Sequence, residues 1–214
     1  MTPLLVFDLD GTLIDGYTAI GEALAYAMGK LGLAPWPDAR VRVMVGHGLE
    51  HLLEQAVGPD RASEGVRLFR ERYPQVAVAG SVVLPSVAQT LGELSERGYP
   101  MAVASNKPAQ FSRLILEAKG IARHFRSIEG PDAATPAKPD PTMLRRILER
   151  EGAEPPATVV VGDMEVDAEF ARAGGCRVVL IPNGSRSRDE LSRVPADGFL
   201  DTIARLPEWL ERAL

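Results

Sequence analysis

A short apolar run that ends in two carboxylates, close to the start of the chain, constrains the fold more than any other feature. Leu4 to Phe7 are all apolar, which is typical of a strand buried on both faces of a parallel sheet. Asp8 and Asp10 follow, and because side chains alternate along a strand, both carboxylates leave its end toward the same side. Two such anions repel each other unless a cation or a proton lies between them. The sequence therefore predicts a strand that delivers two acids to one polar site.

The next two residues fit a site for phosphate. Gly11 permits a tight turn, and Thr12 offers a hydroxyl and a backbone N–H to phosphate oxygens. A solvated turn with a capping aspartate is the alternative for an isolated Asp-Gly pair. Several polar stretches elsewhere in the chain match this one and argue against that alternative.

Composition is that of an ordinary globular protein. The chain has 214 residues, 45% hydrophobic and 25% charged, which suffices for one domain or for a core with a smaller inserted domain. A net charge of −5 without a basic stripe argues against nucleic acid as a partner. No apolar run is long enough for a membrane span or a signal sequence. Cys176 is the single cysteine, which excludes an internal disulfide. We therefore expect a soluble, cytoplasmic protein that is a monomer or a homodimer.

Residues 16–79 show helical patterns and no strand pattern. Apolar residues recur at helical spacing in three stretches, at 20–31, 49–57 and 66–73. Because this segment follows directly on a buried strand, we predict that it is an inserted helical cap. The core then consists of residues 1–15 and 80–214.

Beyond Gly80, strand and helix patterns alternate. Buried-strand patterns occur at 101–104, 158–161 and 177–181, a further short strand is expected at 125–128, and helical patterns separate them, including one at 167–173. This alternation requires crossover connections and predicts a parallel sheet with helices on both faces. The predicted fold class is α/β, with a doubly wound, Rossmann-like core and the helical cap inserted into it.

Polar residues follow the predicted core strands at the ends where open parallel sheets bind their ligands. They are Ser105 and Asn106 after the strand at 101–104, Asp163 and Asp167 after the strand at 158–161, and Lys138 before a helix that begins near Pro141. We expect the sheet to bring these side chains, remote in sequence, into one crevice with Asp8 and Asp10.

Such a crevice has a definite chemistry. The carboxylates of Asp8, Asp10, Asp163 and Asp167 cannot all be ionised there without a compensating cation, and Mg²⁺ fits because it prefers oxygen ligands and bridges to phosphate. Lys138 adds fixed positive charge. An aspartate aimed at phosphorus can act as a nucleophile, and a second aspartate two residues on can protonate the leaving oxygen and then activate water.

Four ordered motifs resemble those of the haloacid dehalogenase superfamily: Asp8-Leu9-Asp10-Gly11-Thr12, Ser105-Asn106, Lys138-Pro139-Asp140-Pro141, and Gly162-Asp163 through Asp167. The resemblance covers nearly the whole chain, and the helical insert is similar to that of the phosphoglycolate phosphatase-like group. It implies Asp8 as nucleophile and Asp10 as acid and base. It also implies Mg²⁺ held by Asp8, the Asp10 backbone carbonyl and Asp163, phosphate held by Ser105, Asn106 and Lys138, and Asp167 supporting the metal or Lys138.

Two positions depart from the family pattern. Met164 stands where Thr or Ser is usual, and Gly16 where Ser is frequent. Because a methionine cannot donate a hydrogen bond, we expect the geometry near Asp163 to differ from that of the family.

The motifs define the reaction better than the substrate, which we expect to be a small phosphorylated metabolite. Phosphoglycolate is the best single candidate by resemblance, and a sugar phosphate, a nucleotide or pyrophosphate is the main alternative. A dehalogenase does not need Asp10, a sugar-phosphate mutase carries a His motif that residues 17–30 lack, and a non-catalytic phosphate-binding protein is expected to have lost Asp8 or Asp10. These three readings are therefore less favoured.

The predicted cap offers one candidate contact to substrate. His47 lies between two glycines and is a candidate to contact the leaving group, with a surface or packing role as the alternative.

Three basic residues, Lys30, Lys107 and Arg186, are expected to be solvated. Lys107 is nevertheless close enough to Ser105 in sequence to enter the site.

Overall fold

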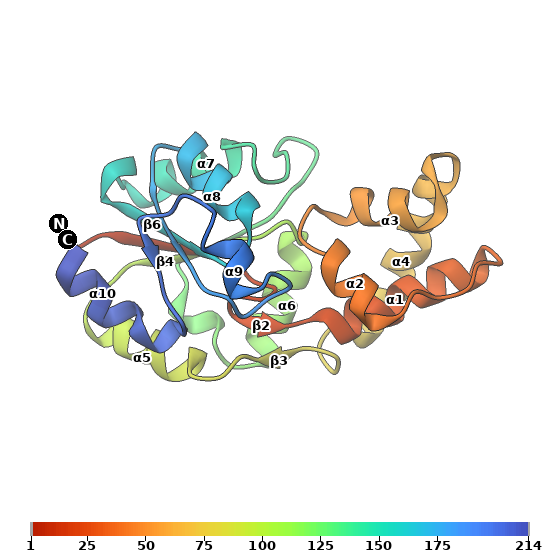
Figure 1. Ribbon diagram of the computed structural model, residues 1–214, viewed down its shortest axis with the longest axis horizontal. Coiled ribbons are helices and arrows are strands. Elements are labelled where there is room, and N and C mark those ends of the chain that lie inside the picture. The colour runs from red at the N-terminus through yellow and green to blue at the C-terminus, as the bar shows by residue number, and fades with distance from the viewer. Residues whose placement is uncertain (1, 214) are drawn as a thin grey trace.

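Six strands form one parallel sheet in the computed structural model, which describes residues 2–213 (Figure 1). In spatial order the strands are β5 (Ser127–Glu129), β4 (Met101–Ala104), β1 (Leu4–Phe7), β6 (Thr158–Gly162), β7 (Arg177–Leu180) and β8 (Gly198–Phe199). Val6 in the central strand pairs with Ala102 on one side and with Val160 on the other, both parallel. The strand order reverses beside β1, so the ends of β1 and its neighbours border the crevice that such sheets use for ligands.

Helices cover both faces of this sheet, as the apolar strand residues require. Leu4 and Val6 pack with α7 (Thr142–Glu151) and α8 (Glu165–Ala173) on one face. Leu5 and Phe7 pack on the other face with α5 (Val87–Glu96), α6 (Ala109–Ala118) and α10 (Leu206–Ala213). The short helix α9 (Arg188–Leu191) follows β7. These layers confirm the predicted doubly wound α/β core.

Four helices lie beyond one end of the sheet, on the right in Figure 1. They are α1 (Tyr17–Lys30), α2 (Asp38–Met44), α3 (Leu49–Val57) and α4 (Ala62–Val76). Their buried faces, including Leu24, Leu53 and Phe69, pack on one another and continue into the apolar cluster under Phe7. The apolar stripes that predicted α1, α3 and α4 are thus the faces that hold these helices together.

A two-stranded antiparallel ribbon joins the four helices to the sheet. The chain leaves through β2 (Ile14–Asp15) and returns through β3 (Val82–Val83), with Ile14 opposite Val83. Neither of these strands, nor β8, is predicted from the sequence, because a segment of two residues is too short to show a periodic pattern.

Some predicted boundaries are wrong by a few residues. The strand predicted at 125–128 is β5 at 127–129, and the helix predicted from Asp167 begins at Glu165. Within residues 2–213, no helix combines the length and apolarity needed to cross a lipid bilayer.

Candidate active site

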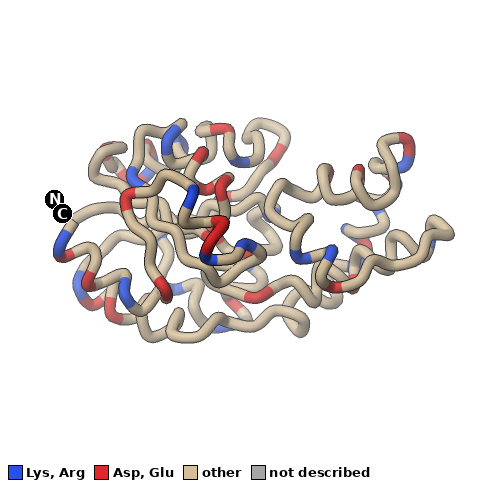
Figure 2. Tube along the Cα trace, viewed as in Figure 1, with Lys and Arg blue, Asp and Glu red and all other residues tan. Residues whose placement is uncertain are grey.

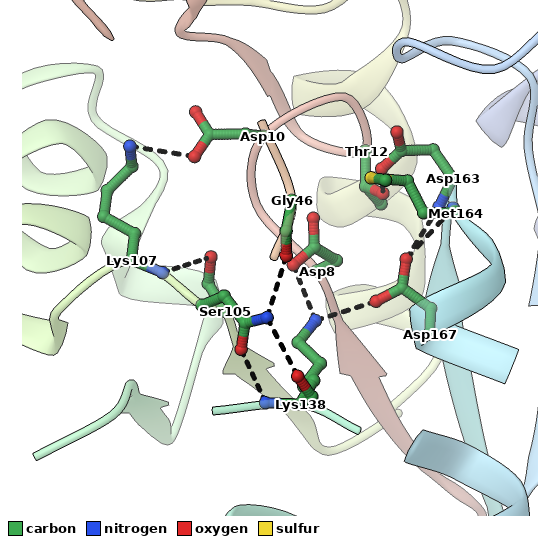
Figure 3. A network of polar contacts seen from close by, with 11 residues as sticks. Asp8, Asp10, Thr12, Gly46, Ser105, Lys107, Lys138, Asp163, Met164 and Asp167 are labelled. Atoms are coloured by element: carbon green, nitrogen blue, oxygen red, sulfur yellow. Dashed lines mark hydrogen bonds and ion pairs between the residues drawn. The ribbon is translucent and has the colours of Figure 1, made fainter. Parts of the chain in front are cut away.

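Asp8 lies at the end of β1 and faces a buried lysine. Its backbone N–H donates to Val161 of β6 over 2.9 Å, which continues the sheet pairing one residue past the strand. Lys138 Nζ lies 2.7 Å from Asp8 Oδ1 and 2.8 Å from Asp167 Oδ1, and this lysine is only 4% exposed (Figure 3). One buried ammonium therefore holds two carboxylates in fixed positions, which compensates part of their desolvation.

Asp167 is held from both sides. Its second oxygen, Oδ2, accepts the backbone N–H groups of Asp163 and Met164, each over 3.1 Å, at the start of α8. The donors at position 164 are thus backbone groups, so this contact does not need the hydroxyl of a Thr or Ser. With both oxygens engaged, Asp167 positions Lys138 and the turn that carries Asp163.

Asp163 is fully buried, and among the described residues only one of its two carboxylate oxygens has a hydrogen-bond partner. Its Oδ1 accepts a hydrogen bond from the Thr12 hydroxyl over 2.8 Å, whereas Oδ2 has no partner among the described residues. The backbone packs closely around this carboxylate, since a Cβ at either Gly11 or Gly184 would overlap it. An unpartnered buried carboxylate oxygen costs free energy unless a ligand binds to it.

The acids of this site fit a divalent cation. One oxygen from each of Asp8, Asp163 and Asp167 lies within 4.8 Å of the others. Burial raises the pKa of Asp8 to about 7 despite the nearby Lys138, and burial, with the charges of Asp8 and Asp167, raises the pKa of Asp163 well above its ordinary value. Both shifts indicate that Lys138 alone does not compensate the negative charges of the ionised acids. Hard oxygen ligands with excess negative charge are the donor set that Mg²⁺ and similar ions prefer.

Asp10 points away from this cluster and pairs with a different lysine. Its Oδ2 lies 2.8 Å from Lys107 Nζ, and its buried Oδ1 has no hydrogen-bond partner among the described residues. Lys107 Nζ also donates to the Tyr73 hydroxyl of α4 over 2.8 Å. Lys107 is only 8% exposed, so the expectation that it is a solvated charge is wrong. The sequence around Lys107 does not predict its contact with Tyr73, because the two residues meet only through the packing of α4.

A cavity with two unlike walls lies over these residues, and we call it the strand-end cavity. Asp8, Asp10, Lys107 and Lys138 line the side of the sheet, and Ile20, Val45, Leu49, Leu52, Phe69 and Tyr73 line the side of the helices. Its volume is about 70 Å³. The charged wall can hold a metal and a phosphate, and the apolar wall limits what can accompany them.

The sequence of this chain matches a known family model. The model described as haloacid dehalogenase-like hydrolase matches residues 5–181, which include every acid and lysine described above. The chain belongs to the haloacid dehalogenase-like hydrolase family. The match confirms the family that the four motifs predicted.

Relatives within this family are similar over nearly their whole length. A phosphoglycolate phosphatase of Rhodospirillum rubrum is 34% identical over 98% of this chain and 91% of the relative, and one of Vibrio parahaemolyticus is 32% identical over 96% and 94%. Among solved structures, one described as a predicted phosphoglycolate phosphatase from Haemophilus somnus 129pt has a TM-score of 0.89 at 27% identity, with 96% of each chain covered. A predicted phosphatase from Clostridium acetobutylicum, with a TM-score of 0.90 at 21% identity and 99% of each chain covered, supports the fold.

Two residues expected to bind phosphate have other contacts in this family member. The Thr12 hydroxyl donates to Asp163, and its backbone N–H donates to Leu9. The Asn106 side chain accepts the backbone N–H of Lys138 over 2.6 Å and donates to the carbonyls of Gly46 and Lys138, over 2.8 and 3.3 Å. Thr12 and Asn106 therefore hold Asp163 and Lys138 in place, since their polar groups are already used.

Ser105 keeps a free donor. Its Oγ accepts the backbone N–H of Lys107 over 3.2 Å, and the side chain lines the strand-end cavity beside Asp8. The hydroxyl proton has no acceptor among the described hydrogen bonds, so it can be donated to a phosphate oxygen.

His47 lies outside the strand-end cavity. Its side chain is exposed and meets the ring of His51 edge to face, with centroids 5.5 Å apart. Both histidines line an outer groove that also contacts residues 129–137, while the neighbouring Gly46 and Gly48 reach the cavity with their backbone. The structure thus brings Asp8, Asp10, Ser105, Lys138, Asp163 and Asp167 together and leaves His47 apart.

Arg186 also differs from its expected solvated state. Its guanidinium forms a forked pair with Glu165 at the start of α8, with contacts of 2.7 to 3.2 Å, and its side chain is 16% exposed. Elsewhere, Figure 2 shows basic and acidic residues interspersed along the trace.

Proposed function

We propose that the protein hydrolyses a small phosphate monoester with the help of Mg²⁺, through an aspartyl-phosphate on Asp8. The observation that supports this most is the pairing of Asp8 with Lys138 beside the unpartnered Oδ2 of Asp163. A carboxylate fixed by one ammonium, next to a vacant carboxylate oxygen, suits attack on a phosphate that is shared with a metal. The relatives named phosphoglycolate phosphatase make 2-phosphoglycolate the first substrate to test.

In the first step, a carboxylate oxygen of Asp8 attacks phosphorus, and the bond from phosphorus to the ester oxygen breaks. Asp10 gives its proton to that oxygen, which leaves as an alcohol. Lys138 keeps Asp8 oriented, and a remaining N–H of its ammonium, with the hydroxyl of Ser105, stabilises negative charge on the phosphoryl oxygens. Bound Mg²⁺, held by Asp8, the Asp10 backbone carbonyl and Asp163, would add positive charge at those same oxygens.

In the second step, Asp10 takes a proton from water, which attacks the phosphorus of the acyl phosphate. The bond from phosphorus to the Asp8 oxygen breaks, inorganic phosphate leaves and both aspartates return to their initial states. One residue thus serves as acid and then as base, which requires it to be near the bridging oxygen in both steps.

We further propose that residues 16–79 act as a cap that closes over the core formed by 1–15 and 80–214. Its contacts with the core include the hydrogen bond from Asn106 to Gly46 and the Met164 side chain packed against Gly46. Closure would exclude water while the phosphoryl group is transferred, and opening would release the product. We place this activity in the cytoplasm, where a single, partly buried thiol such as Cys176 stays reduced.

Release of inorganic phosphate tests the proposal. We expect hydrolysis of 2-phosphoglycolate and of a generic aryl phosphate with Mg²⁺, and loss of both with excess chelator. Asp8→Asn, which preserves shape and removes the nucleophile, should lower kcat at least about 10⁴-fold. Its Tm should not fall, because the folded state already disfavours the charged form of Asp8. Substantial turnover by Asp8→Asn would eliminate the covalent route, and no Mg²⁺-dependent hydrolysis by the unaltered protein would eliminate the phosphatase.

A further inference from the structure

We propose that Lys107 and Tyr73 form a subsite for a carboxylate on the leaving group of the substrate. This inference rests on the proposed function, because it assigns the part of the strand-end cavity that the phosphoryl group does not use. It makes Lys107 and Tyr73 specificity-determining residues, one from the segment after β4 and the other from α4.

Lys107 and Tyr73 have more N–H and O–H groups than their hydrogen bonds within the protein use. The Lys107 ammonium has three N–H groups, of which one is directed to Asp10 and one to the Tyr73 hydroxyl. Tyr73 accepts that hydrogen bond, and its own O–H proton has no acceptor among the described hydrogen bonds. One N–H and one O–H therefore remain, on two atoms 2.8 Å apart that both belong to residues lining the cavity. Two adjacent donors match the two oxygens of a carboxylate.

Both donors are held in place and in the correct protonation state. The Tyr73 ring stacks on Phe69 with centroids 5.1 Å apart and meets Phe111 edge to face at the same distance. Burial raises the pKa of the Tyr73 hydroxyl, which therefore keeps its proton. The Lys107 ammonium is held by its 2.8 Å contacts with Asp10 Oδ2 and with the Tyr73 hydroxyl. The subsite is thus rigid and carries one positive charge.

The rest of the cavity selects against other leaving groups. Lys138 is already shared by Asp8 and Asp167, so Lys107 is the cation left to the leaving group among the described lining residues. The side chains that line this wall are otherwise apolar, as Ile20, Leu49 and Leu52 are, so Tyr73 is the one described side chain of the wall that can bond a sugar hydroxyl. These limits favour a short acid over a sugar or a nucleoside.

The position of the subsite sets where the carboxylate lies in the substrate. Asp10, the proposed acid for the ester oxygen, lies 2.8 Å from Lys107 Nζ. A carboxylate attached through a single carbon to the ester oxygen stays within reach of the same ammonium. The substrate class is therefore the phosphate ester of a short 2-hydroxy acid, as in 2-phosphoglycolate.

Two esters that differ at one group test the inference. Ethyl phosphate has a methyl group where 2-phosphoglycolate has a carboxylate, and the selectivity is the ratio of kcat/KM for 2-phosphoglycolate to kcat/KM for ethyl phosphate. The test variants are Tyr73→Phe, which removes only the hydroxyl, and Lys107→Met. Matched controls are Tyr26→Phe, whose hydroxyl contacts Glu71 on the surface, and Lys30→Met at an exposed position.

We expect the unaltered protein to favour 2-phosphoglycolate, with the ratio falling about 10-fold in Tyr73→Phe and about 100-fold in Lys107→Met, as lost hydrogen bonds to a charged group require. The controls should keep the ratio of the unaltered protein. Equal losses for both esters would show that Lys107 and Tyr73 serve only Asp10, and a ratio near one in the unaltered protein would show no carboxylate site. Either result overturns the inference and leaves the phosphatase intact, whereas hydrolysis of neither ester overturns the phosphatase and the inference together.

Discussion

The two walls of the strand-end cavity differ in how their residues are held. On the sheet side, the functional groups have polar partners: Lys138 lies between Asp8 and Asp167, and Asp10 pairs with Lys107. On the helix side, the residues are held by apolar packing, and Tyr73 alone among the cavity-lining side chains of α1–α4 contributes a polar group. Replacing an apolar side chain by another of similar size is tolerated far better than breaking a buried ionic network. The reaction is therefore tied to the sheet, and the choice of leaving group can change through the helices.

The largest effect is expected at the centre of the charged wall. Lys138→Met leaves two buried carboxylates without their ammonium, so the free energy of unfolding should fall by about 3–5 kcal/mol. The value of kcat should fall about 10³-fold, because the charge that orients Asp8 and faces the phosphoryl group is lost. Denaturant unfolding and phosphate release measure the two effects. Lys30→Met, on the exposed end of α1, is the matched control and should change neither quantity. A stable and active Lys138→Met would show that the two walls do not differ as described.

The next effect concerns the pH dependence of stability without metal. Burial raises the pKa of Asp8 from 3.8 to about 7, so the folded state holds this proton more tightly than the unfolded chain. The resulting stability is complete below about pH 4 and is lost as the pH rises through 7. Between about pH 5.5 and pH 8 the metal-free protein should lose about 2 kcal/mol.

Mg²⁺ should reverse this loss, because it compensates the ionised acids, and the Tm gain on adding Mg²⁺ should be larger at about pH 8 than at about pH 5.5. Asp8→Asn is the control, since it removes this titrating group, and its profile should fall less steeply with pH because only the raised pKa of Asp163 still contributes. A metal-free profile that rises with pH in both proteins would contradict the assignment to Asp8.

The smallest effect is expected where the two walls meet. Gly46 has a φ of +125°, and a Cβ there would overlap the Met164 side chain, so Gly46→Ala should lower stability by about 1–2 kcal/mol and raise KM. Gly29→Ala, in open space on α1, is the control and should raise stability by about 0.5–1 kcal/mol. Thermal unfolding and steady-state kinetics measure both variants. Equal behaviour of the two would mean that the Gly46 contact does not matter.

The sequence predicted the sheet and most of its charged wall because both depend on local patterns. An apolar run such as Leu4 to Phe7 identifies a strand, and the parallel arrangement then brings Asp8 and Asp163 to the same edge. Helical stripes likewise predicted α1, α3 and α4. Resemblance to a family added the expected roles of these residues.

Side-chain partners across long sequence separations could not be predicted in this way. Thr12 and Asp163 are 151 positions apart, and Lys107 and Tyr73 are 34 apart, so no local pattern reports either pair. The polar groups of Thr12 and Asn106 suit phosphate as well as protein, and only the packed structure shows which of the two they contact. The exposure of His47 depends similarly on how α2 and α3 are joined.

The β2–β3 ribbon has a consequence for how such a chain can change. Because the polypeptide departs at Ile14 and returns beside it at Val83, the ends of the excursion are already fixed together. Lengthening, shortening or exchanging the intervening segment then adds little loop-closure entropy and leaves the strand register as it was. A helical module transplanted from another protein between these two anchor points would meet an unaltered set of acids, which makes this junction a natural graft site for engineering new selectivity.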